Sequence, residues 1–295
     1  MRRLGQHFLK NKSAIKKIVA ALDAQDSDIV IEIGPGHGEL TQEIINYQLS
    51  IFKNDKSGIK IIAIEKDKNL AEELARNFQC SIFNFQEDAS RVLSENFILF
   101  NDDALKILAP LVEFLNLKIE NLKLKIVGNI PYYITGHLLR ILSEIKNKPA
   151  VSIFTIQKEV AERIVARPPR MNRLAAITQF WAEPKILFRL SPDDFSPPPE
   201  VNSAVIKLEA RNTYHEAQGT QNYYKTVKIL FAQPRKTILN NLAAGTKNHE
   251  SKIMNQNLRE EISKKLLDIG IKSGDRPQDL GVGDIIKIAD YFKLK

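Results

Sequence analysis

The sequence predicts an α/β fold in which helices wrap a mostly parallel sheet, with a smaller all-helical domain at the C-terminal end. Apolar strand-like runs alternate with stretches of helical spacing as far as Leu208, which is the pattern of a parallel sheet. The run Ile29–Ile33 leads directly into a glycine-rich turn, Gly34-Pro35-Gly36-His37-Gly38. Beyond a polar stretch at residues 211–219, the spacing of the apolar residues is helical only.

The first helix is predicted from Ser13 to Leu22, where apolar residues recur at helical spacing. Asn11 stands just before it, where its side chain can accept from the free N–H groups of the first turn. Strands are then predicted over residues 29–33, 59–64, 97–100, 124–127 and 150–156, and the last is followed by a helix over residues 158–166.

A proline-rich segment, Pro192 to Pro199, cannot be a helix or a central strand, because proline lacks an N–H group and fixes φ. We expect it to be a stiff loop between strands 186–190 and 204–208, which would pair antiparallel at the edge of the sheet. Phe195 is the aromatic residue of this loop, and a stiff loop can hold such a residue at the mouth of a pocket.

The C-terminal part is predicted to consist of helices. Pro234 suits the first turn of a helix that carries Arg235 and Lys236. Two further amphipathic helices are predicted over residues 258–267 and 284–292.

The composition excludes several classes of protein. No apolar run approaches the roughly 20 residues that span a bilayer, and Met1-Arg2-Arg3 leads into no signal core. We therefore expect a cytoplasmic protein that has no membrane partner. The single cysteine, Cys80, rules out internal disulfides and a cysteine-based zinc site. The five histidines show no metal-ligand spacing, so we expect no metal.

The net charge of +8 is unevenly distributed along the chain. Residues 1–20 carry six Lys/Arg and no acid, and residues 211–295 carry 15 basic and 9 acidic side chains. Residues 21–210 carry 22 basic and 26 acidic side chains. Basic ends on either side of an acidic middle indicate a polyanionic partner, and the alternative is a solvated lysine-rich surface.

Glycine or acidic residues follow successive predicted strands, at the ends where ligands bind in open α/β sheets. Gly34 and Gly36 let the backbone come close to a ligand, and the helix after them offers free N–H groups. Glu65 is placed to accept from both hydroxyls of a ribose, and Asp103 from the amine of an adenine. The turn has Gly-x-Gly-x-Gly instead of the dinucleotide-binding Gly-x-Gly-x-x-Gly, so it indicates an adenosine-bearing ligand other than NAD.

The segment Asn129-Ile130-Pro131-Tyr132 follows a predicted strand and points to a second ligand. The side-chain oxygen of Asn129 and the carbonyl of Ile130 can each accept one hydrogen of a planar amine. Tyr132 offers a ring face for a heterocycle, worth roughly 1–3 kcal/mol per base. Two acceptors that draw the amine hydrogens out of the ring plane return the lone pair to nitrogen, which makes the amine a better nucleophile. The segment therefore indicates group transfer to a nucleobase amine.

These motifs resemble those of the bacterial 16S ribosomal RNA adenine N6,N6-dimethyltransferases, and the resemblance runs almost from end to end. Its blocks are Leu4-Gly5-Gln6-His7-Phe8-Leu9, Glu32-Ile33-Gly34-Pro35-Gly36, Gly128-Asn129-Ile130-Pro131-Tyr132, Gln157-Lys158-Glu159-Val160, Phe195-Ser196-Pro197-Pro198-Pro199 with Ser203-Ala204-Val205, and Arg235-Lys236-Thr237. The resemblance implies a Rossmann-like S-adenosylmethionine-dependent methyltransferase domain over residues 1–210, in which residues 1–24 form a basic segment that caps the donor site. It implies a helical RNA-binding domain over residues 211–295.

The resemblance also implies roles for single residues. Contacts with the donor, S-adenosylmethionine, are implied for His7, Leu9, Gly34, Gly36, Glu65, Asp103 and Asn129. Asn129, Ile130 and Pro131 would hold the target amine, while Tyr132 stacks on one face of the adenine and Phe195 flanks the other. Arg235 and Lys236 are the predicted RNA contacts. The implied partner is small-subunit ribosomal RNA in a pre-30S particle, and we expect a monomer to act on it.

The chain departs from the family pattern at three places. Tyr133 stands where the family usually has Asn, and Pro234 replaces an arginine. Residues 167–173 form a shorter loop than usual, without its Ser-Lys-x-Tyr-Gly run. None of these changes touches the predicted donor site, but the loop and Pro234 affect predicted RNA contacts.

Two alternatives share many of these features. A large-subunit RNA adenine methyltransferase of the antibiotic-resistance type has the same turn, although the length and the C-terminal domain favour the small-subunit enzyme. A ribosome-assembly factor that acts mainly by binding would also use a basic surface. Intact Glu65, Asp103 and Asn129 argue against an inactive enzyme but not against such a second role.

Overall fold

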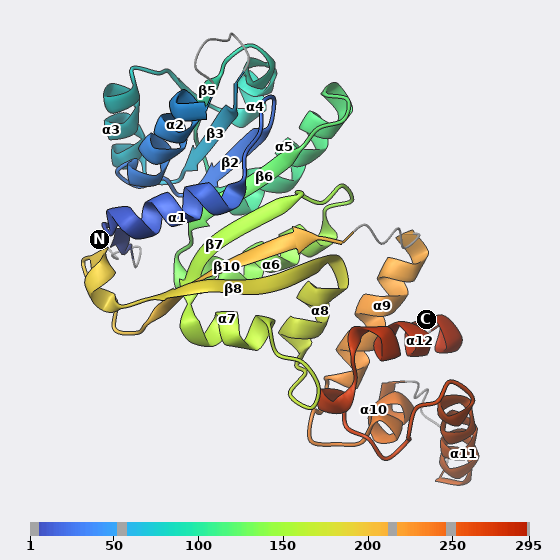
Figure 1. Ribbon diagram of the computed structural model, residues 1–295. Coiled ribbons are helices and arrows are strands. Elements are labelled where there is room, and N and C mark those ends of the chain that lie inside the picture. The colour runs from blue at the N-terminus through green and yellow to red at the C-terminus, as the bar shows by residue number, and fades with distance from the viewer. Residues whose placement is uncertain (1–5, 52–57, 212–216, 246–251, 294–295) are drawn as a thin grey trace. The chain divides into compact units, whose positions relative to one another are not determined.

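The computed structural model describes residues 6–51, 58–211, 217–245 and 252–293. Contacts within the chain divide it into two compact units (Figure 1). The first unit consists of Met1–Ala161 and Glu183–Ala210, and the second of Glu162–Ala182 and Arg211–Lys295. Among the described residues, no helix is both long enough and apolar enough to cross a bilayer.

The first unit contains an eight-stranded sheet with the order β4-β5-β3-β2-β6-β7-β10-β8. Its strands are β2 (Ile29–Ile33), β3 (Lys60–Glu65), β4 (Ile82–Phe83), β5 (Phe97–Asn101), β6 (Leu124–Asn129), β7 (Val151–Gln157), β8 (Ala182–Leu190) and β10 (Ser203–Ala210). Neighbours from β4 to β7 run parallel, and β10 runs antiparallel to β7. The predicted mostly parallel sheet is confirmed, with β8 and β10 adjacent at one edge.

Helices connect these strands, and four of them begin at a side-chain cap. They are α1 (Lys12–Leu22), α2 (Glu39–Ile51), α3 (Lys68–Phe78), α4 (Phe85–Asp88), α5 (Ala104–Lys118), α6 (Thr135–Glu144) and α7 (Lys158–Ile164). The caps are Asn11 for α1, Asp67 for α3, Asn84 for α4 and Asp103 for α5, each accepting from a backbone N–H of the first turn. The predicted first helix and its Asn11 cap are confirmed.

The carboxyl ends of the central strands meet at one edge of the sheet. The register places Ile33 beside Ile64 on one side and beside Gly128 on the other, and Glu65 beside Asn101. The residues that follow these strands are therefore neighbours in space, as the sequence predicts.

The opposite, amino edge of the sheet holds a buried ion pair. Lys125, at the start of β6, has its Nζ 2.8 Å from Oδ2 of Asp28, and the side chains are 8% and 1% exposed. Lys125 also donates to the carbonyl of Asp23, and the N–H of Gln25 donates to Asp28 Oδ2. The pair ties the loop before β2 to the start of β6.

A second, two-stranded sheet joins β1 (Phe8–Leu9) to β9 (Phe195–Ser196). Its register pairs Phe8 with Ser196 and Leu9 with Phe195. Beside it, Asn11 Nδ2 donates to Asp194 Oδ1 at 2.7 Å. These contacts tie the residues before α1 to the proline-rich loop.

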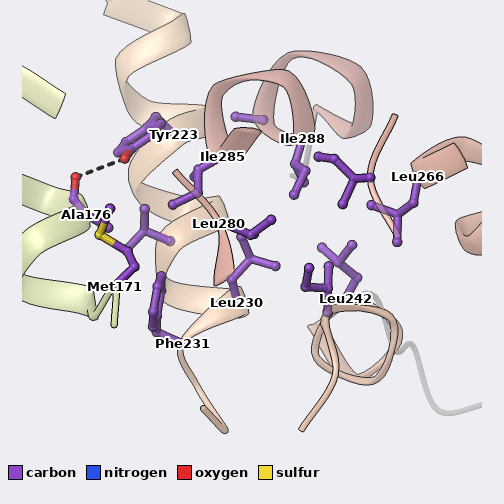
Figure 2. Packing of buried hydrophobic residues seen from close by; sticks show 14 of the residues in the cluster. Met171, Ala176, Tyr223, Leu230, Phe231, Leu242, Leu266, Leu280, Ile285 and Ile288 are labelled. Carbon is purple, nitrogen blue, oxygen red and sulfur yellow. Dashed lines mark hydrogen bonds between the residues drawn. The ribbon is translucent and has the colours of Figure 1, made fainter. Parts of the chain in front are cut away.

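The second unit is a helical bundle of α8 (Arg173–Trp181), α9 (Ala217–Leu230), α10 (Ile238–Gly245), α11 (Lys252–Asp268) and α12 (Val282–Phe292). Figure 2 shows its apolar core, in which Met171 and Ala176 lie beside Tyr223. The Tyr223 hydroxyl donates to the carbonyl of Ala176 at 2.9 Å, and its ring stacks on Phe180 at 3.9 Å between centroids.

This packing differs from the predicted division at residue 211. The main part of the second unit does begin there, but residues 162–182, which we assigned to the sheet domain, group with the C-terminal helices. The physical reason is that α8 buries Ala175, Ala176 and Phe180 in the same cluster as α9 and α12.

The prediction that a helix begins at Pro234 is wrong. Residues 231–237 form a turn, and α10 begins only at Ile238. The buried side chain of Asn241 satisfies the backbone of this turn, because its Nδ2 donates to the carbonyls of Gln233 and Lys236 and its Oδ1 accepts from the N–H of Gln233. The turn therefore needs no helical hydrogen bonds.

Candidate active site

The glycine-rich turn after β2 forms one wall of a cavity at the carboxyl edge of the sheet. Gly34 and Gly36 have φ of +66° and +62°, a backbone conformation that residues with a Cβ rarely adopt. A Cβ at Gly34 would meet no heavy atom within 4 Å, so it would project into open space, whereas one at Gly36 would lie 2.7 Å from the Phe8 ring. The turn thus leaves room at Gly34 for a ligand and admits no side chain at Gly36.

Glu65, at the tip of β3, presents a buried carboxylate beside this turn. Its Oε2 accepts from the Gly36 N–H at 3.1 Å, and its Oε1 accepts from the Asp67 N–H at 2.8 Å. Burial raises the pKa of Glu65, and the backbone donors oppose that shift. A carboxylate has about four acceptor positions, so these backbone donors leave part of its capacity for hydroxyl groups such as those of a ribose.

Asp103 follows β5 and is occupied by contacts within the protein. Its Oδ1 accepts from the Leu105 N–H at 3.0 Å, and its Oδ2 lies 2.9 Å from Nζ of Lys66. Burial raises the pKa of Asp103, but the hydrogen bonds from Lys66 and Leu105 and the Lys66 charge outweigh it, and the pKa lies below its usual value. Asp103 is ionised, but it is not among the residues that line the cavity.

Asn129 ends β6 and is held in one orientation. Its Nδ2 donates to the carbonyl of His7 at 2.6 Å, which leaves the side-chain oxygen as an acceptor. The next residue, Ile130, donates its N–H to the carbonyl of Thr155 at 3.0 Å. The backbone of the turn is thereby fixed against β7, and both Asn129 and Ile130 line the cavity.

Tyr132 closes the cavity with a half-buried ring. Its hydroxyl lies 2.7 Å from Oγ of Ser203, and burial raises the pKa of Tyr132, so the phenol is neutral at physiological pH. The His7 ring lies 6.0 Å from the Tyr132 ring between centroids, at an interplanar angle of 25°. His7 Nδ1 is itself 2.9 Å from the carbonyl of Pro197.

The cavity brings together most of the residues that the sequence predicts for the site. It is lined by Gln6, His7, Phe8, Gly34, Gly36, Glu65, Asn129, Ile130, Pro131 and Tyr132. Gln6 and Phe8 were not predicted as site residues, although they stand within the Leu4–Leu9 block. Alternation along β1 explains why Phe8 faces the cavity while Leu9 is buried on the other side, but no local pattern marks Gln6.

Leu9 and Phe195 do not line the cavity, in contrast to the prediction. Leu9 is 6% exposed and Phe195 is 1% exposed, and both lie in the hydrophobic cluster under α1. The physical reason is the pairing of β1 with β9, which places these two residues opposite each other and covers them. In this conformation the Phe195 ring is not available to the face of a base.

A second buried carboxylate lies close to the first. Glu32 in β2 is 1% exposed, and burial raises its pKa to about 8, against a hydrogen bond of 2.6 Å from the Thr41 hydroxyl. The nearby charge of Glu65 raises the pKa further. Glu32 is therefore protonated at neutral pH and links β2 to α2.

The predicted RNA contacts lie in the second unit. Arg235 and Lys236 are exposed in the turn between α9 and α10. Within the part of the chain that the structure describes, no cluster of three or more His, Cys, Asp or Glu side chains could hold a metal ion.

A mostly parallel sheet with a glycine turn, an acid at the next strand tip and an Asn-x-Pro-Tyr turn is the arrangement of a Rossmann-like methyltransferase. The chain belongs to the ribosomal RNA adenine dimethylase family, whose model matches residues 1–269.

Among relatives, the chain is 35% identical to the ribosomal RNA small subunit methyltransferase A of Dehalococcoides mccartyi, over 82% of this chain and 74% of that one. It is 30% identical to the protein of the same name from Francisella tularensis subsp. novicida, over 98% and 96% of the two chains.

Two solved structures have the same fold over nearly their whole length. A dimethyladenosine transferase from Plasmodium falciparum matches with a TM-score of 0.70 at 22% identity, over 97% of this chain and 98% of that one. The 23S rRNA methyltransferase ErmE matches with a TM-score of 0.65 at 20% identity, over 97% and 99%.

Proposed function

We propose that this protein transfers methyl groups from S-adenosylmethionine to the N6 amines of two adjacent adenines in a hairpin loop near the 3′ end of 16S ribosomal RNA. The product is N6,N6-dimethyladenosine, formed by a cytoplasmic monomer on a pre-30S particle. The observation that carries the proposal is the fixed orientation of Asn129, whose amide oxygen is left free beside the cavity that Gly34 and Glu65 line.

The donor pocket fits an adenosine-bearing ligand. Gly34 leaves open space where a Cβ would stand, and Glu65 keeps acceptor positions for the ribose hydroxyls. His7 and Asn129 would hold the methionine end, and Asp103 would accept from the adenine amine by exchanging its bond to Lys66. S-adenosylmethionine, when bound, supplies a methyl group on a positively charged sulfur that is a good leaving group.

The Asn129-Ile130-Pro131-Tyr132 turn would prepare the target amine. The Asn129 side-chain oxygen and the Ile130 carbonyl accept its two hydrogens, which returns the nitrogen lone pair from the ring to the reacting nitrogen. Tyr132 supplies a neutral ring face for the adenine, held in place by Ser203. The amine loses its proton after the new bond has formed, so these residues position and polarise without a general base.

The adenine must leave its stack to reach this turn, as in other enzymes that modify bases. The role assigned to Phe195 by resemblance then requires β1 to separate from β9, because their pairing covers the ring. His7, whose ring lies nearly parallel to that of Tyr132, is the cavity residue that faces the same space in this conformation.

The second unit would bind the RNA. Its exposed turn carries Arg235 and Lys236, and residues 211–295 hold 15 basic against 9 acidic side chains. Each phosphate neutralised adds about −0.7 to −0.9 to the slope of log affinity against log salt. Replacing both residues by alanine should make this slope shallower in filter binding and leave donor affinity unchanged. An unchanged slope would assign the turn to scaffolding.

Mass spectrometry of ribosomal RNA from cells that lack this protein tests the proposed substrate. Loss of dimethyladenosine from 16S RNA, with restoration by the wild-type gene, is the expected result. Loss of the modification from 23S RNA instead would favour the antibiotic-resistance type of enzyme. If both RNAs are unchanged and only small-subunit assembly is impaired, the protein acts as a binding factor.

A further inference from the structure

The outward face of α1 is a row of lysines with no acid in the helix. Lys12, Lys16 and Lys17 are exposed, and the first acidic residue of the whole chain is Asp23. The opposite face, with Ala14, Ile15, Ile18, Val19 and Leu22, is buried in the cluster against the sheet. The orientation of α1 is therefore fixed by its apolar face, which leaves Lys12 and Lys16 on the solvent side.

The positions of Lys12 and Lys16 are electrostatically unfavourable for the helix itself. Lys12 is in the first turn, where the positive end of the helix dipole disfavours a cation. Lys12 and Lys16 are four residues apart, so two like charges are neighbours on the helix surface. Within the described residues, neither ammonium group has a carboxylate within 4 Å. Nothing in the described structure compensates the two charges.

The start of α1 is attached to the cavity. Gln6, His7 and Phe8 line it, and Phe8 is the first residue of β1. The Lys10 N–H, just after β1, donates to the Asp194 carbonyl at 2.9 Å. Lys12 is thus close in the chain to the residues that touch the ligand. Four residues of helix rise by about 6 Å, so Lys16 continues the row away from the cavity.

We propose that the exposed face formed by Lys12, Lys16 and Lys17 binds the phosphates of the RNA strand next to the target adenine. This inference rests on the proposed function, since it takes the partner to be single-stranded RNA entering the cavity. Flexible ammonium groups suit phosphates that must move while the base turns out. Lys17 lies about 100° around the helix from Lys16 and borders the row, with its ammonium 5.8 Å from the Phe188 ring centroid.

The test compares two double variants of the full chain. Lys12→Gln with Lys16→Gln removes two charges of the row, and Lys118→Gln with Lys123→Gln removes two equally exposed lysines at the amino edge of the sheet. The probe is a synthetic RNA hairpin with two adjacent adenines in its loop. Filter binding at several salt concentrations gives the affinity and its salt slope, and calorimetry gives the donor affinity.

The row variant should have a slope shallower by about 1.4, because each lysine would release about 0.7 counterion from a single strand. At 0.1 M salt this corresponds to an affinity roughly 25-fold lower. The control variant and the donor affinity should stay near wild type. The thermal midpoint of the row variant should not fall, since the change removes like-charge repulsion.

Equal slopes for the two variants would overturn the inference and leave the row as a solvated face. A row variant that loses donor affinity together with RNA affinity would also overturn it, since that result means a structural role. If the wild-type protein itself neither binds nor methylates the hairpin, the proposed function fails instead of this inference.

Discussion

The two edges of the parallel sheet differ in whether their buried carboxyl groups have a cationic partner. At the amino edge, the carboxylate of Asp28 is buried with the ammonium of Lys125 only 2.8 Å away. At the carboxyl edge, Glu32 and Glu65 are buried with no cation paired to either within the described residues, and each is raised in pKa. One edge is complete within the protein, whereas the other keeps acceptors and open space for a ligand.

The difference shows that the buried carboxyl groups without a cationic partner lie at the edge that carries the cavity. Burial disfavours a charged carboxylate by several kcal/mol unless a partner compensates it. At the amino edge, the two charges of the ion pair compensate each other, and their hydrogen-bonding positions are taken by groups of the protein. The carboxyl edge combines buried acids with glycines whose positive φ opens space, and the buried Glu65 gains compensation when a ligand donates hydrogen bonds to it.

The largest expected effect is on turnover at the carboxyl edge. Asn129→Ala should abolish methyl transfer to adenine while donor affinity stays largely intact, because it removes an acceptor for the target amine but only a peripheral contact with the donor. Calorimetry with S-adenosylmethionine and a tritium-transfer assay on the same protein measure the two quantities. Turnover above about a tenth of wild type, which is roughly 1.4 kcal/mol of barrier, would remove Asn129 from the mechanism.

At the amino edge the expected effect is on stability alone. Lys125→Ala leaves Asp28 buried without its cation and should lower the free energy of unfolding by about 3–5 kcal/mol. Chemical denaturation measures the loss, and the exposed neighbour Lys123→Ala serves as the control, with a change within about 0.5 kcal/mol. Donor affinity of the folded variant should match wild type. A specific loss of donor affinity would mean that the two edges are not independent.

The pH dependence of stability separates the edges further. The folded-state pKa of Glu32, about 8, lies above the value of 4.5 for the unfolded chain, so the unfolded chain releases this proton first as the pH rises. The free energy of unfolding should therefore fall by about 1.4 kcal/mol per pH unit, or roughly 4 kcal/mol from pH 5 to pH 8. Glu32→Gln should remove this slope in denaturation series at both pH values. Identical slopes in the two proteins would show that Glu32 is not the titrating group.

The smallest of these effects concerns the donor. Glu65→Ala removes a charged acceptor for the ribose hydroxyls, which is worth about 1.5–3 kcal/mol, so donor affinity should fall roughly ten- to hundredfold. Glu65→Gln, which keeps an acceptor oxygen of the same reach, should lose less. Calorimetry with S-adenosylmethionine measures both variants. Unchanged affinity in the alanine variant would place the ribose elsewhere.

The sequence predicts the carboxyl edge better than the surroundings of the site. Periodicity identifies the central strands, and parallel strands must end at one edge, so the meeting of Gly34, Glu65 and Asn129 follows from local pattern. The burial of Phe195 depends on pairing with Leu9, and no local pattern indicates a contact between residues so far apart in the chain. The bond from Lys66 to Asp103 is likewise a matter of side-chain geometry.

The helical unit shows the same limit. The spacing of apolar residues predicts α11 and α12 near their observed positions, but it does not show that α8 packs with them. A short amphipathic helix such as α8 can bury its apolar face against any neighbour, and the choice is made by tertiary packing. Pro234 likewise suits a helix start, yet Asn241 supplies the hydrogen bonds that favour a turn.

The pairing of β1 with β9 determines when, during synthesis of the chain, the donor cavity can be completed. His7 leaves the ribosome 190 residues before Pro197, which accepts from its ring, and Phe8 likewise emerges long before its strand partner Ser196. Until then the cavity lacks one wall, although the glycine turn and Glu65 are already in place. Donor binding is therefore expected late in biosynthesis, because a nascent chain that stops short of the proline-rich loop lacks the strand that pairs with β1.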